Sequence, residues 1–233
     1  MNFRFWNIGR RELWILLPAV VVCGSLLIFA EITSEVRENE WHDAETALMK
    51  SLRTPEDLSV PVGPKWMQHA ALDISALGGG SVLTLMALLV LGYLVLLRHY
   101  HAMLLLLVAT VGGTLLNNIL KQIFGRARPD IVPHLSEVAS ASYPSGHSML
   151  SAIVYLTLGV MLAQSTSSWR LRMYLVGAAL FLSFLIGLTR VYLGVHYPTD
   201  VLAGWTVGTA YAVLCAMIAN WLQKRGKVES PER

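Results

Sequence analysis

Six long apolar segments constrain this chain more than any other feature of its sequence. A helix needs about 20 consecutive apolar residues to cross the hydrocarbon core of a bilayer. Six segments come near that length: 13–32, 81–97, 102–120, 148–164, 173–189 and 201–222. The charged fraction is only 14%, and 55% of the 233 residues are hydrophobic. The sequence therefore predicts an all-α, polytopic membrane protein, a six-transmembrane-helix bundle in which residues 1–233 form a single domain.

The segment between the first two predicted spans carries two shorter amphipathic patterns. In each, large or small apolar residues recur at roughly helical spacing: Trp41, Ala44, Leu48 and Leu52 in the first, and Trp66, Ala70, Ile74 and Leu77 in the second. We predict two short extramembrane helices here, which either lie at the outer membrane surface or pack as a cap over the bundle. The triplet Gly78–Gly80 then marks the entry to the second span.

Basic residues near the span ends predict the orientation. One side of the predicted bundle holds ten of them: Arg4, Arg10, Arg11, Arg98, Arg170, Arg172, Lys224, Arg225, Lys227 and Arg233. Outside the polar clusters described next, the other side holds four: Arg37, Lys50, Arg53 and Lys65. The excess of positive charge on the cytoplasmic side of membrane proteins places both termini in the cytoplasm. Membrane anchoring and these clusters account for the net charge of +3, so it indicates no nucleic-acid partner.

A first polar cluster, residues 121–129, follows the third predicted span. Lys121 closes the span, a position where lysine often serves as an interfacial anchor. Arg128 follows seven residues later, with Arg126 between them, and basic residues on the outward side run against the orientation rule. A phosphate ligand would account for them, because arginine holds two phosphate oxygens in a fork and lysine supplies a mobile charge. Arg126 is either a second phosphate contact or a solvated neighbour.

A second cluster, residues 142–148, leads directly into the fourth predicted span. Ser145 is a good helix-capping residue, and Pro144 stops the preceding chain. A helix N-terminus also offers unpaired backbone N–H groups to an anion, and Gly146 would let the backbone approach a phosphate closely. His147 lies at the mouth of such a pocket, where it could protonate a leaving oxygen.

The third cluster, residues 190–200, joins the fifth and sixth predicted spans. Arg190 ends the fifth, and Pro198 suits the first turn of the sixth. Asp200 could cap that helix, but its spacing of four residues from His196 also permits a carboxylate–imidazole hydrogen bond. Such a bond fixes the tautomer of the ring and leaves its far nitrogen free to attack.

Together, the order and spacing of the three clusters closely resemble the three-part signature of the type 2 phosphatidic acid phosphatase superfamily, in its membrane lipid phosphatase branch. The resemblance covers roughly residues 121–204, and Thr189 stands where the family usually has serine. It implies that His196 is the nucleophile, that Asp200 supports it, and that His147 is the acid and base. It further implies a set of substrate-binding residues and no metal or other cofactor. The substrate-binding residues are Lys121, Arg128, Ser145, Gly146 and Arg190.

The resemblance also predicts the function, and the distribution of basic residues predicts the side of the membrane that the site faces. We expect a metal-independent lipid phosphatase of the cytoplasmic (inner) membrane, with its active site on the periplasmic or extracellular side. A phosphohistidine would form during hydrolysis of a lipid phosphomonoester or diphosphate. Undecaprenyl diphosphate is the leading candidate, with phosphatidylglycerophosphate and phosphatidate beside it. A lipid A phosphatase, a haloperoxidase and a non-enzymatic lipid or anion transporter are the alternatives.

Overall fold

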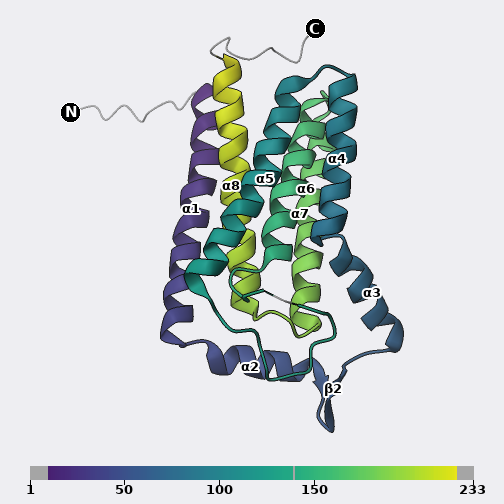
Figure 1. The fold of residues 1–233 in the computed structure, drawn as a ribbon. Helices are drawn as coiled ribbons and strands as arrows, with labels where there is room; N and C mark the ends of the chain where they lie inside the picture. The colour runs from purple at the N-terminus through teal and green to yellow at the C-terminus, as the bar shows by residue number, and fades with distance from the viewer. Residues whose placement is uncertain (1–9, 139, 225–233) are drawn as a thin grey trace, which may run out of the picture.

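The computed structural model describes residues 10–138 and 140–224. They form eight α-helices and a two-stranded antiparallel hairpin: α1 (Arg10–Glu38), α2 (His42–Ser51), β1 (Arg53–Thr54), β2 (Asp57–Pro61), α3 (Lys65–Ala76), α4 (Gly80–Leu96), α5 (Tyr100–Phe124), α6 (Gly146–Gln164), α7 (Trp169–Tyr192) and α8 (Pro198–Lys224). The six long helices, α1 and α4 to α8, run side by side as a bundle (Figure 1).

The long helices have the length and composition of membrane spans. Five of them, α1 and α5 to α8, are each long and apolar enough to cross a bilayer, and α3 with α4 forms a sixth candidate. That pair is bent by 47° at the glycine-containing break between Ala76 and Gly80, where α4 begins. The predicted all-α bundle with six spans is therefore confirmed. Five of the six long helices extend beyond their predicted apolar runs because backbone hydrogen bonding continues into the flanking residues, whereas α4 is shifted by one residue from the predicted 81–97.

Helix α6 is the central helix of the bundle. It packs against α5, α7 and α8. In its apolar 18-residue segment, 56% is buried inside the protein, compared with 6% in that of α1. Two glycines let α8 approach α6 closely. A Cβ atom at Gly204 would lie 2.7 Å from the carbonyl oxygen of Ser145, and one at Gly208 would lie 2.6 Å from that of Met149. This close packing fixes the N-terminus of α6 beside the start of α8.

The shorter elements, α2, the hairpin and α3, gather at one end of the bundle, where α2 lies across the helix ends (Figure 1). Both predicted short helices exist, as α2 and α3. The apolar pattern of α2 faces away from the bundle, which agrees with the alternative of a helix at the membrane surface. Glu45 and Met49 are buried, whereas Trp41 and Leu48 are 46% and 48% exposed. The side of α2 that carries Glu45 packs on the bundle because polar partners of Glu45, Arg126 and Thr199, lie there. The hairpin β1–β2 was not predicted.

The start of α1 and the end of α8 lie at the opposite end of the bundle from α2 (Figure 1). The start of α1 and the end of α8 thus lie on the same side, away from the three polar clusters, as an even number of spans requires. Four of the residues used to predict orientation lie outside the described residues: Arg4, Arg225, Lys227 and Arg233. The side of the membrane that each end faces stays a prediction.

Candidate active site

Four helix ends carry the predicted site residues to one end of the bundle. Lys121 lies in the last turn of α5, and Arg190 in the last turn of α7. Ser145 caps α6, accepting a hydrogen bond from the backbone N–H of Ser148 at 3.5 Å. Asp200 lies in the first turn of α8. Its carbonyl oxygen accepts a hydrogen bond from the Ser145 backbone N–H at 2.9 Å, which joins the second and third clusters directly.

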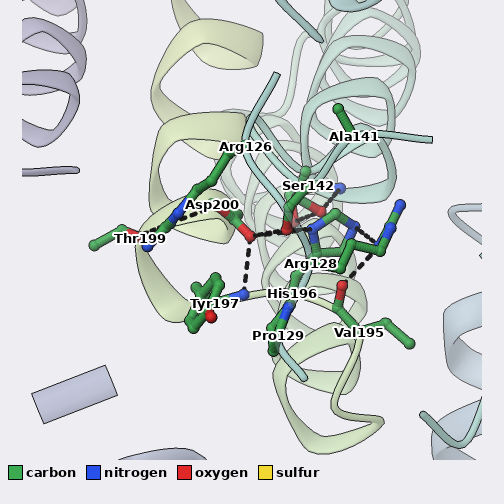
Figure 2. Close-up of polar contacts among 12 residues, drawn as sticks. Arg126, Arg128, Pro129, Ala141, Ser142, Val195, His196, Tyr197, Thr199 and Asp200 are labelled. Carbon is green, nitrogen blue, oxygen red and sulfur yellow. Dashed lines mark hydrogen bonds and ion pairs between the residues drawn. The ribbon is translucent and has the colours of Figure 1, made fainter. Parts of the chain in front are cut away.

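His196 lies in the short connection between α7 and α8, and it is 1% exposed. Its Nδ1 atom is 3.4 Å from Oδ2 of Asp200, and its Nε2 atom is 3.2 Å from an Nη1 atom of Arg128 (Figure 2). A guanidinium has donors only, so Nε2 must accept, and the ring proton must sit on Nδ1 facing the carboxylate. The predicted carboxylate–imidazole pair is therefore present, with the unprotonated nitrogen directed toward a cation.

The environment of His196 disfavours its charged form. Burial is the largest influence and lowers the pKa of His196 to about 4; the hydrogen bond and the charge of Asp200 oppose this shift, and Arg128 adds to it. Burial likewise lowers the pKa of Arg128 although Asp200 opposes it. An imidazole with this pKa is uncharged at neutral pH, as a nucleophile has to be.

Lys121 and Arg128 converge on one stretch of the loop between α5 and α6. The Arg128 Nε donates to the carbonyl oxygen of Ser140 at 2.8 Å, and its Nη1 donates to that of Val195 at 2.6 Å. The Lys121 ammonium donates to the Ser140 hydroxyl at 3.3 Å and to the carbonyl oxygen of Ala141. In this arrangement neutral loop oxygens accept from both cations, and a phosphate could replace those oxygens because it is the stronger acceptor.

Arg190 is a nearly buried cation with spare hydrogen-bonding capacity. Its Nη1 donates to the hydroxyl of Ser75 on α3 at 2.7 Å, while its Nε has no partner among the described residues. A buried donor without a partner costs free energy unless a ligand satisfies it. Arg190 is therefore suited to an anionic ligand, and Ser75 ties α3 to the same site.

His147 and Gly146 form the first turn of α6. A Cβ atom at Gly146 would lie 3.4 Å from the side chain of Asn117 on α5. His147 lies against the break between α3 and α4: a Cβ atom at Gly79 would be 3.8 Å from its Nε2 atom, and one at Gly78 would be 3.4 Å from its Cβ. The glycine triplet thus marks the entry to α4, as predicted, and its first two glycines lie beside the histidine.

Arg126 differs from both sequence interpretations. It is neither a solvated neighbour nor a free phosphate contact, because its side chain is only 15% exposed and lies between two carboxylates. Its Nη1 donates to Oδ1 of Asp200 at 2.7 Å (Figure 2). Its Nη2 donates to Oε2 of Glu45 at 2.8 Å. Burial opposes its charge, but the carboxylates of Asp200 and Glu45 outweigh burial and raise the pKa of Arg126.

Two further side chains complete the surroundings of Asp200, and sequence reasoning assigned a role to neither. The Ser142 hydroxyl donates to Oδ2 of Asp200 and lies 3.4 Å from Nδ1 of His196. Glu45 comes from α2, far away in the sequence. Ser142 lies within the second cluster, three residues before the cap, so its place in the motif was a usable signal. Glu45 was one of several acids in a polar stretch, and nothing in the local pattern distinguished it.

Within residues 10–138 and 140–224, no group of three or more His, Cys, Asp or Glu side chains is placed to hold a metal ion. The charged groups around His196 are mostly cations: Lys121, Arg126, Arg128 and Arg190. Cationic side chains attract an anionic ligand directly, without a bridging metal.

Comparison with known proteins assigns the chain to a family. Residues 102–224 match the model of the PAP2 superfamily, so the chain belongs to this superfamily. It is 32% identical over 188 residues to phosphatidylglycerophosphatase B of Bacillus subtilis (strain 168), covering 78% of this chain and 86% of the relative. It is 37% identical over 79 residues to the undecaprenyl-diphosphatase of Sulfolobus acidocaldarius, covering 34% of each chain.

A solved structure extends the match to the fold. The crystal structure of a transmembrane PAP2-type phosphatidylglycerolphosphate phosphatase from Bacillus subtilis superposes with a TM-score of 0.80 at 26% sequence identity. The match covers 92% of this chain and 100% of that one. The protein is thus an integral membrane phosphatase of the PAP2 superfamily, and the resemblance inferred from the three clusters is confirmed.

Proposed function

We propose that this membrane phosphatase hydrolyses a lipid phosphate through a phosphohistidine formed on His196. The observation that carries the proposal is the position of the His196 ring between Arg128 and Asp200. Its Nε2 lone pair faces a cation, and its Nδ1 proton faces a buried carboxylate. This is the arrangement that a histidine nucleophile requires, because the attacking nitrogen is unprotonated and the opposite nitrogen is held by a base.

In the first step, Nε2 of His196 attacks phosphorus while the bond from phosphorus to the lipid oxygen breaks. His147 donates a proton to that departing oxygen, and Asp200 stabilises the positive charge that develops on the attacked ring. In the second step, His147 accepts a proton from a water molecule, which attacks the phosphohistidine. The phosphorus–nitrogen bond breaks, and inorganic phosphate leaves.

Lys121, Arg128 and Arg190 bind the phosphate oxygens in this mechanism, together with the Ser145 hydroxyl and the backbone N–H of Gly146. Fixed donors aimed at the phosphate lower the barrier because its charge is redistributed in the transition state. We infer that no metal is needed, since these cations supply the neutralisation that Mg²⁺ provides in other phosphoryl-transfer enzymes.

The substrate is proposed to be an amphiphile whose headgroup reaches the end of the bundle while its tail stays in the bilayer. The family resemblance found in the sequence made undecaprenyl diphosphate the leading candidate substrate. The relative matched over most of the chain is a phosphatidylglycerophosphatase, so phosphatidylglycerophosphate stands beside it as a candidate. A transporter fits less well, because transporter sites lie near the bilayer midplane in broken helices, whereas these charges gather at helix ends.

The test is phosphate release by the purified protein in detergent micelles. The panel contains phosphatidate, phosphatidylglycerophosphate, undecaprenyl diphosphate and lipid A, with and without EDTA, beside the variant His196→Ala. We expect turnover of at least one lipid, no effect of EDTA, and a loss of at least about 1,000-fold in His196→Ala, as for removal of other covalent nucleophiles. Undiminished release by His196→Ala would exclude the nucleophile, and loss in EDTA with rescue by Mg²⁺ would exclude the metal-free mechanism.

A further inference from the structure

Glu45 is a buried carboxylate that reaches the start of α8 from the surface helix α2. It is 4% exposed. Its Oε1 atom accepts from the backbone N–H of Thr199 at 3.0 Å and from the Thr199 hydroxyl at 2.5 Å. A carboxylate that accepts from the first turn of a helix is favourable there because it satisfies an unpaired N–H group and complements the helix dipole. Glu45 therefore fixes the backbone immediately before Asp200.

The second oxygen of Glu45 leads to Asp200 through Arg126. Oε2 of Glu45 accepts from Nη2 of Arg126 at 2.8 Å, and Nη1 of Arg126 donates to Oδ1 of Asp200 at 2.7 Å. The same Nη1 atom donates to the Thr199 hydroxyl at 2.8 Å, and the guanidinium lies over the Tyr197 ring at 4.1 Å. The guanidinium is thus held on several sides, and it closes a ring of contacts between α2 and α8.

The charges of this group matter as much as its geometry. An arginine paired with Asp200 alone would neutralise the carboxylate that has to support a positive ring on His196. Glu45 adds a second negative charge, so the three side chains together keep a net charge of −1 next to the ring. In a poorly solvated site, this charge favours the cationic phosphohistidine more than it would in water.

We propose that Glu45 and Arg126 are positioning residues for the phosphatase reaction. They hold Oδ1 of Asp200, so that Oδ2 faces Nδ1 of His196, and they keep the site negative on that side of the ring. The inference rests on the proposed role of His196 as nucleophile. It assigns α2 a part in the chemistry, although neither Glu45 nor Arg126 touches the phosphate.

The decisive variant is Glu45→Gln, because glutamine keeps an oxygen for Thr199 but removes the charge. Formation of labelled phosphohistidine is measured by rapid mixing with a base quench, and its burst amplitude counts the folded, active sites. We expect the rate of phosphohistidine formation per active site to fall by about 10- to 100-fold, as for other residues that orient a functional ligand. KM should stay within about twofold of the wild-type value, because substrate-binding groups are untouched.

A matched control lies on the same helix: Asp43→Asn removes one negative charge from an exposed position of α2 and should leave the rate unchanged. Arg126→Met should slow the reaction as well. The double variant Glu45→Gln/Arg126→Met should lose less than the product of the two single losses, because both residues act through Asp200. A lower burst amplitude with an unchanged rate per site would show a purely structural role and overturn the proposal.

The result for His196→Ala separates this inference from the proposed function. If His196→Ala keeps its activity, the phosphohistidine mechanism fails and the positioning role fails with it. If His196→Ala is inactive and Glu45→Gln turns over at the wild-type rate per site, only the positioning role is overturned.

Discussion

The two carboxylate oxygens of Asp200 have different partners: Oδ1 contacts Arg126, and Oδ2 faces the His196 ring. Oδ1 accepts from Arg126, and Oδ2 accepts from the Ser142 hydroxyl, from the Tyr197 backbone N–H at 2.9 Å and from the His196 ring. A buried charge is tolerated only when hydrogen bonds replace its lost hydration, and this group has four donors. The donors also fix the plane of the carboxylate, so the ring of His196 has one favoured orientation.

The protonation of His196 gives a prediction at this scale. Burial lowers its pKa to about 4, below the ordinary value of 6.5, so the ring stays neutral on acidification until the pH approaches 4. In ¹⁵N NMR spectra of histidine-labelled protein in nanodiscs, we expect the His196 signal to report a neutral ring with the proton on Nδ1 from pH 8 to about pH 5. Assignment comes from the missing signal in His196→Gln.

The same shift determines how stability depends on pH. The unfolded chain binds the His196 proton near pH 6.5, and the folded chain binds it only near pH 4. Folding therefore loses stability as the pH falls through this interval, and His196→Gln should lose less than the wild type. A His196 signal that titrates near pH 6.5, or carries its proton on Nε2, would contradict the assigned ring state.

At the scale of elements, the sequence predicted the helix ends well because their signals are local. Pro198 at the start of α8, Ser145 as the cap of α6 and Lys121 in the last turn of α5 all lie where local rules put them. The pairing of Glu45 with Arg126 has no local signal, since 81 residues separate the partners. Contacts of this kind follow from how α2 packs on the bundle, which hydrophobic patterns alone do not encode.

The close packing of α8 on α6 gives the second prediction. At Gly208, an added Cβ atom would lie 2.6 Å from the Met149 carbonyl oxygen and 3.0 Å from Cβ of Ala152, so the helices would have to separate. Gly208→Val should lower the free energy of unfolding by about 1–3 kcal/mol, as overpacking does elsewhere. Differential scanning fluorimetry in detergent measures the loss as a lower melting temperature.

Gly177 offers the matched control for this substitution. It lies in the middle of α7, and a Cβ atom there would meet nothing within 4 Å. Gly177→Val should therefore keep the wild-type melting temperature within about 2 °C, because exposed substitutions change stability by no more than about 0.5 kcal/mol. Equal melting temperatures for Gly208→Val and the wild type would show that α6 and α8 are not as closely packed as described.

At the scale of the whole molecule, the protein combines an apolar outer surface with one polar end. Large apolar side chains on the outside of the bundle are widely exposed, among them Leu88, Leu96 and Phe181. In water such a surface would drive aggregation, whereas lipid tails solvate it. The polar groups of the candidate site lie at the end that carries α2 and the hairpin (Figure 1). The proposed lipid substrate would therefore meet the protein at this end.

The orientation of this polar end is the last prediction. The distribution of basic residues places it outside the cytoplasm, together with the exposed hairpin residue Glu56, and places the exposed Ser167 between α6 and α7 inside. After replacement of Cys23 and Cys215 by alanine, single variants Glu56→Cys and Ser167→Cys can be treated with a membrane-impermeant maleimide in intact cells. We expect labelling of Glu56→Cys alone, and labelling of both after permeabilisation. Labelling of Ser167→Cys alone in intact cells would reverse the orientation and bring the site to the cytoplasmic leaflet, where it would act on a different pool of lipid phosphates.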